Sequence, residues 1–165
     1  MITVFSVDPP VAWSLMTEHK ILARGRVPIR KGTEAAWTAR WIDVINAHDP
    51  DIVGIEGVHL RTYGDDEPYV RTAKQRGAIV LARRAGIIEG LCRVLRPGVP
   101  IEIVDTGDWR ETSGFKEKWG RVRLKDAAIA LVKQLYGLNV THDEADAILI
   151  GRHVAIVGAL SGRGI

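Results

Sequence analysis

The chain is poor in cysteine and proline and has no long hydrophobic run: its 165 residues include 1 Cys and 7 Pro. The single cysteine, Cys92, excludes a disulfide framework and a cysteine-based zinc site, and its apolar neighbours over 87–92 predict a buried, inert thiol. No apolar stretch approaches the roughly 18 residues of a membrane span, and no basic-then-apolar leader opens the chain. We therefore expect a soluble, cytoplasmic protein with no membrane partner.

The net charge is also low, at +3, from 23 basic and 20 acidic side chains. With 46% hydrophobic and 26% charged residues, the composition excludes disordered and fibrous proteins. The length fits one compact domain. We place that domain at residues 1–160 and expect 161–165 to be a frayed tail.

Basic residues are concentrated in one segment. Residues 110–125 contain six of them, Arg110, Lys116, Lys118, Arg121, Arg123 and Lys125. Three aromatic residues are interleaved with or adjacent to them, Trp109, Phe115 and Trp119, which is typical of a surface that binds a phosphate backbone and stacks on bases. A solvated loop leading into a helix explains the segment equally well.

The hydrophobic pattern predicts one α/β domain with a mixed five-stranded sheet. Residues 2–7, 11–16 and 20–28 predict three strands joined by tight turns, hence an antiparallel meander. Residues 51–57, apolar on both faces, and 100–104 predict a fourth and a fifth strand that add in parallel, while helices are expected at 34–47, 78–95, 124–136 and 141–159. Alternation of this kind places helices on both faces of the sheet. Residues 61–72 predict a mobile loop.

The predicted helix 78–95 carries a stripe of small residues spaced by four, Ala82, Gly86 and Gly90. Each glycine costs a helix about 1 kcal/mol relative to alanine, so close approach of another helix is the natural compensation. That helix could belong to this chain or to a second copy, and the stripe fits both equally.

Four carboxylates have apolar neighbours in the sequence: Asp8, Glu56, Asp143 and Asp146. An unpaired ionised carboxylate in apolar surroundings costs several kcal/mol, so a cation should offset that cost. Because the chain has one cysteine and no paired histidine motif, Mg²⁺ or Mn²⁺ fits best.

Simpler explanations exist for some of these acids. Asp8 precedes two prolines and could be a turn residue, and Glu56 could pair with a buried arginine. Thr141 and Glu144 spell a capping box, which explains Glu144 fully and Asp143 in part. Asp146 and Glu56 are therefore the stronger indications of a site.

The predicted topology brings the four acids together. A first strand beside a fourth, both ending at one edge, places Asp8 next to Glu56, and a helix start over that edge adds Asp143 and Asp146. Such a cluster can bind two metal ions about 4 Å apart, which clamp the attacking and leaving oxygens of a phosphodiester. The chemistry it implies is hydrolysis by a metal-activated water.

Three segments resemble the acidic motifs of RuvC-type Holliday junction resolvases, in the RNase H-like (retroviral integrase) superfamily. They are Val7-Asp8-Pro9, Ile55-Glu56-Gly57-Val58 and the run from Asp143 to Leu149, Asp-Glu-Ala-Asp-Ala-Ile-Leu. The predicted order of elements is also that of the superfamily, so the resemblance covers nearly the whole chain. It implies an RNase H-like fold and a dimeric endonuclease that nicks four-way DNA junctions symmetrically.

The resemblance also implies roles for individual residues. Asp8, Glu56, Asp143 and Asp146 would be the catalytic, metal-binding tetrad, holding two Mg²⁺ or Mn²⁺ ions. Some members carry His at the place of Asp143, so His142 is a further candidate ligand. Basic residues that touch the scissile phosphate correspond most nearly to Arg110 and Lys125. The family dimerises through the helix that here carries Ala82, Gly86 and Gly90.

The chain departs from the family pattern in two places. Asp8-Pro9-Pro10-Val11 is shorter than the usual turn and lacks its glycines. After the second motif, His59 stands where the family tends to carry an aromatic that inserts into the junction, with Tyr63 a few residues later, and the 61–72 loop is longer than is typical. These differences affect junction selectivity rather than catalysis.

Two alternative functions follow from the same residues. The first is a nuclease of the same fold on flap or fork DNA or on RNA, as in the YqgF-like relatives, although the pair Asp143 and Asp146 argues against that branch. The second is a non-catalytic binding module for DNA or protein, against which the complete set of four acids speaks.

Overall fold

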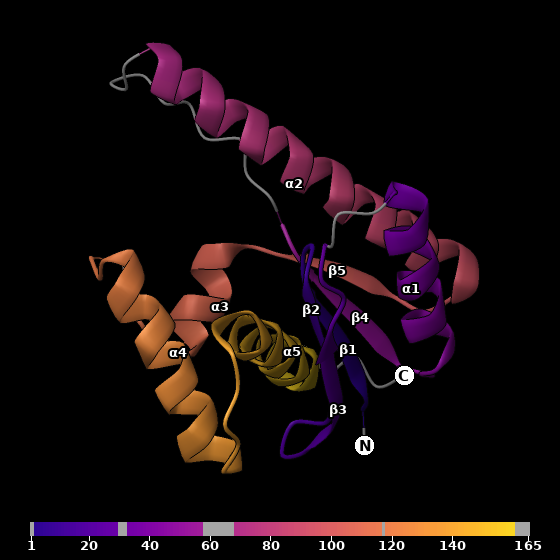
Figure 1. Ribbon diagram of the computed structural model, residues 1–165. Helices are drawn as coiled ribbons and strands as arrows, with labels where there is room; N and C mark the ends of the chain where they lie inside the picture. The colour runs from indigo at the N-terminus through magenta and orange to yellow at the C-terminus, as the bar shows by residue number, and fades with distance from the viewer. Residues whose placement is uncertain (1, 30–32, 58–67, 117, 161–165) are drawn as a thin grey trace.

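The computed structural model describes residues 2–29, 33–57, 68–116 and 118–160 (Figure 1). The elements over this part of the chain follow in order: β1 (Val4–Asp8), β2 (Ala12–Met16), β3 (Ile21–Arg26), α1 (Glu34–Asn46), β4 (Ile52–Glu56), α2 (Pro68–Leu95), β5 (Ile101–Val104), α3 (Thr106–Thr112), α4 (Arg121–Tyr136) and α5 (His142–Leu160).

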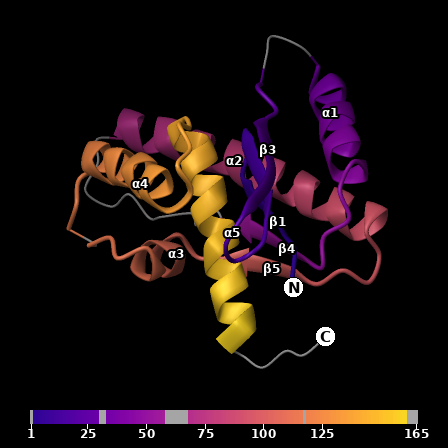
Figure 2. The same ribbon diagram turned by 90° about the horizontal axis from the view of Figure 1, so that it is seen from below.

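The five strands form one mixed sheet in the order β3-β2-β1-β4-β5. The pairs β1–β2 and β2–β3 are antiparallel, whereas β1–β4 and β4–β5 are parallel. Helices cover both faces: α5, with α3 and α4 beside it, lies on one, and α1 and α2 lie on the other (Figures 1 and 2). The mixed sheet predicted from the sequence is confirmed.

Each face of the sheet has its own hydrophobic core. Under α5, the fully buried Ile148 and Val154 pack with residues of β1, β2 and α4. Under α1 and α2, Trp41 and Ile88 pack with alternate residues of β1 and β4. Cys92 belongs to this second core, where burial raises the pKa of its thiol to about 12. The prediction of a buried thiol is confirmed, and the raised pKa agrees with an inert one.

The helix α2 starts earlier than predicted. It begins at Pro68, inside the segment expected to be a loop, so that expectation is wrong for 68–72, and residues 61–67 lie outside the described residues. Proline is well suited to a first helical position because its missing N–H is not needed there. The polar stretch that follows shows no apolar periodicity, since this half of α2 projects past the sheet (Figure 1).

The two glycines of the small-residue stripe do not pack against another element in the described part of the chain, whereas Ala82 is partly buried. A Cβ added to Gly86 or Gly90 would meet nothing within 4 Å. Two large apolar residues of this helix, Val80 and Leu81, are 45% and 39% exposed. This part of α2 therefore presents an open surface.

Two smaller differences complete the comparison with the predicted elements. The helix α3 was not expected at all, because its seven residues include a glycine and three charged side chains and show no apolar stripe. The helix α4 begins three residues before the predicted start. In the described part of the chain, no helix is both long enough and apolar enough to cross a membrane.

Candidate active site

Two of the four acids end neighbouring parallel strands. Val7 of β1 is in register with Ile55 of β4. The last residues of the two strands, Asp8 and Glu56, therefore lie side by side at the same edge of the sheet. Among the neighbouring charges, that of Glu56 contributes most to the raised pKa of Asp8. The sequence-predicted juxtaposition of these two acids is thus present.

The helix α5 is fixed above this edge by a buried polar contact. Ser6 of β1 donates a hydrogen bond from Oγ to the carbonyl oxygen of Ala147 at 2.7 Å and shares another with Ser14 Oγ at 2.7 Å. One turn later, Gly151 allows close approach, because a Cβ there would lie 2.6 Å from Ser6 Oγ. Since Ala147 follows Asp146, these contacts set the position of Asp146 relative to the strand that ends in Asp8.

The carboxyl group of Asp8 has a strongly perturbed pKa. Burial raises it most, and the negative charges of Glu56, Asp146 and Asp143 raise it further. The other three predicted acids therefore lie close enough to Asp8 to raise its pKa. Buried carboxylates whose pKa is raised by burial and by neighbouring like charges cluster at functional sites.

Asp146 is perturbed in the same direction. Burial and the charge of Glu56 raise its pKa from 3.8 to about 7, against the opposing charges of Arg110 and Lys125. The acid is half-buried between the buried Ala145 and Ala147 of α5. The two basic residues that the family resemblance assigns to the scissile phosphate thus lie close enough to influence an acid of the cluster.

Glu56 is held by two donors from α3. The hydroxyl of Thr106 and the indole N–H of Trp109 both donate to Oε1 of Glu56, each at 3.0 Å. No buried arginine takes this role among the described residues. These two hydrogen bonds could not be predicted from the sequence, because the donors lie 50 and 53 residues away from Glu56 on a helix that was not predicted.

Asp143 is paired with an arginine and lies beside a histidine. Arg26, the last residue of β3, donates from Nη2 to Asp143 Oδ2 at 2.9 Å, and His142 Nε2 lies 2.9 Å from Asp143 Oδ1. Sequence analysis missed Arg26. His142 does lie at the cluster, as its candidate role required.

Glu144 belongs to the helix cap and not to the cluster. Its Oε2 accepts hydrogen bonds from the backbone N–H and the hydroxyl of Thr141 at 3.0 and 2.9 Å, and its other oxygen pairs with Arg24. Burial alone would raise the pKa of Glu144, but the bonds from Thr141 and the charge of Arg24 lower it overall. The predicted capping box is confirmed.

The basic segment divides into two groups around the cluster. Arg110 and Lys125 lie near Asp146, and Arg110 carries a buried Nε without a hydrogen-bond partner in the described part of the chain. The remaining four basic residues are exposed: Lys116, Lys118, Arg121 and Arg123. His59 and Tyr63 lie outside the described residues.

The aromatic residues of this segment differ from the expected stacking surface. Trp109 is 2% exposed and packs edge-on against Phe115, so its ring cannot stack on a base, and that expectation is wrong for Trp109. Phe115 is partly buried against the α5 core. Trp119 is half-buried, with the guanidinium of Arg123 4.3 Å from its ring centroid.

The donor set suits a hard divalent cation. It consists of carboxylate oxygens, which Mg²⁺ and Mn²⁺ prefer, and burial opposes ionisation of two of its members unless positive charge is supplied. Over the residues that the structure describes, no three His, Cys, Asp or Glu side chains converge closely enough to hold one ion. The four acids therefore lie near one edge of the sheet, but their carboxylates are not close enough to share one ion. Asp143 is paired with Arg26 and lies beside His142.

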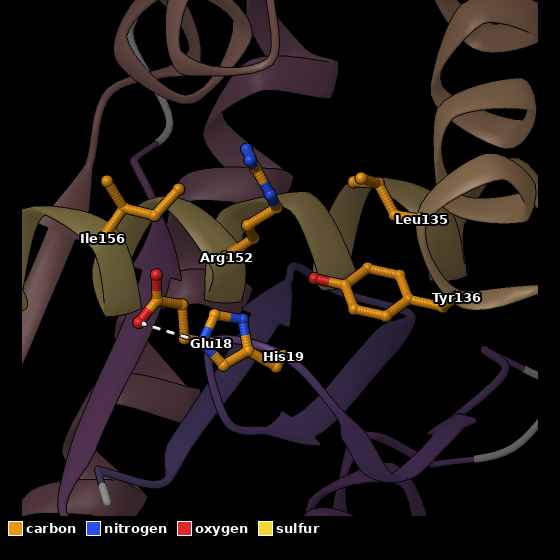
Figure 3. Close-up of a pocket in the computed structure, with 6 residues that line it drawn as sticks. All are labelled: Glu18, His19, Leu135, Tyr136, Arg152 and Ile156. Atoms are coloured by element: carbon orange, nitrogen blue, oxygen red, sulfur yellow. Dashed lines mark ion pairs between the residues drawn. The ribbon is translucent and has the colours of Figure 1, made fainter.

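A separate hollow lies at the other end of the sheet. Figure 3 shows it between the β2–β3 turn, the end of α4 and the outer side of α5. Its volume is about 220 Å³. Its lining residues are Glu18, His19, Leu135, Tyr136, Arg152 and Ile156. Because the β2–β3 turn adjoins the start of β1, whereas the acids follow its end, this hollow is not part of the acidic cluster.

Comparison with known proteins identifies the fold. No protein-family model and no curated protein matches the chain. A solved structure of Thermus thermophilus RuvC matches with a TM-score of 0.59 and 17% identity over 97% of each chain. A structure of T. thermophilus RuvC in complex with Holliday junction substrate gives the same TM-score and identity over 98% of this chain and 97% of that one. The chain therefore has the RNase H-like fold of RuvC over nearly its whole length.

Proposed function

We propose that this chain is a metal-dependent, structure-selective DNA endonuclease that resolves four-way junctions by paired symmetrical nicks. The observation that carries the proposal is the position of the four acids: Asp8 and Glu56 end the paired strands β1 and β4, and Asp143 and Asp146 lie at the start of α5, where they influence Asp8. The fold supports it, since one structure with the same fold is RuvC in complex with Holliday junction substrate.

In this proposal Asp8, Glu56, Asp143 and Asp146 hold two Mg²⁺ or Mn²⁺ ions, and His142 assists from beside Asp143. When bound, such ions act as Lewis acids that activate water and stabilise charge on a phosphodiester. Bound cations would offset the burial and the neighbouring negative charges that oppose ionisation of Asp8 and Asp146 in the protein alone.

The basic residues form two groups that would contact DNA at different distances from the cut. Arg110 and Lys125, which act electrostatically on Asp146, would contact the phosphate that is cut. Lys116, Lys118, Arg121 and Arg123 are exposed along the approach to α4 and its first turn, where they would hold the backbone farther from the cut. His59 and Tyr63 remain candidates for the contact at the junction centre.

Symmetrical cutting of a four-way junction requires two copies of the site, and α2 is the surface we propose for pairing. Its Gly86 and Gly90 face open space, and Ile79, Val80 and Leu81 are exposed on the same helix. Gly86→Arg should convert a dimer to a monomer in multi-angle light scattering and abolish paired nicks. A monomeric wild type that still cuts both strands of a junction would contradict this arrangement.

The decisive test is a nicking assay on a fixed four-way junction with Mg²⁺ or Mn²⁺. Duplex, flap and RNA–DNA hybrid substrates serve as controls, and Asp146→Asn serves as the inactive variant. Paired symmetrical nicks confined to the junction would establish the proposal. Cleavage of flaps or hybrids instead would keep the metal site and change the substrate, and junction binding without cleavage would indicate a binding module.

A further inference from the structure

The helix α3 makes a specific contact with one oxygen of one acid. Thr106 Oγ1 and Trp109 Nε1 both reach Oε1 of Glu56, at 3.0 Å each. A carboxylate oxygen has two lone-pair sites, so these two bonds occupy Oε1 and leave Oε2 as the oxygen that can accept from a cation.

The two donors are themselves fixed. Trp109 is 2% exposed within the core under α5, and Thr106 is the first residue of α3, whose N-terminus is capped by the side chain of Asp105. At the other end of α3, Thr112 Oγ1 lies 2.8 Å from Nδ1 of His153 on α5. The helix is thus anchored to the same element that carries Asp143 and Asp146.

We propose that α3 is a positioning element for Glu56: Thr106 and Trp109 hold Oε1 so that the carboxylate presents Oε2 to a divalent cation. This inference rests on the proposed function, because it assigns Glu56 to the metal site. Groups that orient metal ligands in this way are often as important as the ligands, and their removal typically weakens metal binding about 10–100-fold. Thr106 and Trp109 are positioning residues and do not contact the reacting atoms.

A purely structural role makes a different prediction. If the two bonds only compensate a half-buried carboxylate, their loss lowers the stability of the protein and leaves its affinity for metal unchanged. Metal affinity measured without DNA therefore separates the two roles.

The experiment measures Mn²⁺ binding to the full chain by electron paramagnetic resonance of free Mn²⁺. Thr106→Val removes the hydroxyl at nearly constant shape, and Trp109→Phe removes the indole N–H. Together they should weaken Mn²⁺ binding about 10–100-fold, and Thr106→Ser, which keeps the hydroxyl, should bind as the wild type does. In nicking assays the Mn²⁺ concentration for half-maximal rate should rise in parallel, while the rate at saturating Mn²⁺ recovers.

Trp41→Phe is the matched control for the tryptophan change. Trp41 is fully buried, and its Nε1 has no hydrogen-bond partner among the described residues, so this variant loses packing without losing a bond to Glu56. It should bind Mn²⁺ like the wild type. Should Trp109→Phe fail to fold, Thr106→Val with its serine rescue tests the inference alone.

The outcomes distinguish the inference from the proposed function. A wild type that binds Mn²⁺ and nicks junctions, beside variants that bind Mn²⁺ equally well, overturns the positioning role and leaves the endonuclease proposal intact. A wild type that neither binds Mn²⁺ nor nicks any substrate overturns both. Weakened binding in Trp41→Phe as well would assign the effect to packing and overturn the positioning role.

Discussion

The two ends of the paired strands β1 and β4 carry aspartates in opposite electrostatic states. At the end where β4 begins, Asp51 accepts hydrogen bonds from the backbone N–H and the hydroxyl of Thr3, both at 2.7 Å. These bonds lower the pKa of Asp51. At the other end, burial and three neighbouring acids raise the pKa of Asp8.

The same contrast recurs within two residues on α5. Glu144 has a lowered pKa because Thr141 and Arg24 outweigh its burial, whereas burial and Glu56 raise the pKa of Asp146 to about 7. Asp51 and Glu144 are acids that stabilise the fold through donors. Asp8 and Asp146 are acids whose ionisation lowers the stability of the protein without metal. In the proposed function they are present because they bind metal ions.

The largest expected effect is on activity. Asp146→Asn should reduce junction nicking roughly 10²–10³-fold or more, because it removes a charged ligand from the proposed metal site. Without metal at pH 8 the same variant should melt at a higher temperature than the wild type, since it removes a carboxylate whose ionisation the fold opposes. Nicking assays test the expected loss of activity, and thermal melts without metal test the expected rise in melting temperature. A variant that nicks normally would remove Asp146 from the tetrad.

The next effect concerns the distance between α5 and the sheet. Gly151→Ala should destabilise the protein by about 1–3 kcal/mol, because its Cβ would lie 2.6 Å from Ser6 Oγ and 2.8 Å from Met16 Sδ. Lifting α5 also moves Asp146 away from Asp8, so nicking at a temperature where the variant is folded should fall as well. Urea denaturation gives the stability.

Gly158→Ala is the control for that variant, because a Cβ there would make only an ordinary contact, 3.8 Å from Ile52 Cδ1. It should leave both stability and nicking close to the wild type. Equal losses in the two variants would show that any alanine in this half of α5 is harmful, and the specific contact with Ser6 would then lose its significance.

A smaller effect is the pH dependence of stability without metal. An acid with a raised folded-state pKa makes the folded state bind more protons than the unfolded state, so stability falls as pH rises. For Asp146 the loss should extend from about pH 4, its unfolded range, to about pH 7. Urea denaturation across this range should show the loss in the wild type, and saturating Mg²⁺ should reduce it.

Two histidines contribute an opposite trend, and the comparison must remove it. Burial lowers the pKa values of His48 and His153, so their contribution is present above about pH 6.5 and is lost as pH falls. Subtracting the Asp146→Asn curve from the wild-type curve cancels this contribution. A difference that does not change with pH would contradict the perturbed state of Asp146.

The sequence predicted the sheet and the acidic positions because both depend on local patterns. Alternating and continuous apolar runs define the strands, and an acid such as Glu56 stands out at the end of such a run. The partners of the acids are different. Nothing local to Trp109 indicates that its indole reaches Glu56, and nothing at Arg26 indicates a pair with Asp143, 117 residues away.

The missed helices have a related cause. α3 and the first turns of α2 lack an apolar stripe: α3 buries little beyond Trp109, and α2 extends past the sheet. Hydrophobic periodicity detects a helix by the face it buries, so helices without a continuous buried face escape it. The remaining signals were local ones, namely Asp105 as a cap directly after β5 and Pro68 at a first helical position.

The smallest expected effect lies at the opposite end of the strands. Asp51→Ala should cost about 1 kcal/mol at pH 7, a modest loss because the group is exposed and screened by solvent, and nicking should not change. Since the folded-state pKa of Asp51 is lowered, its contribution is present above about pH 4 and disappears as pH falls below that value. In denaturation curves the Asp51→Ala difference should therefore shrink towards acid pH. The difference in stability caused by Asp146→Asn should have the opposite sign and grow towards neutral pH. The reason is that ionised Asp51 stabilises the folded state, whereas ionised Asp146 destabilises it.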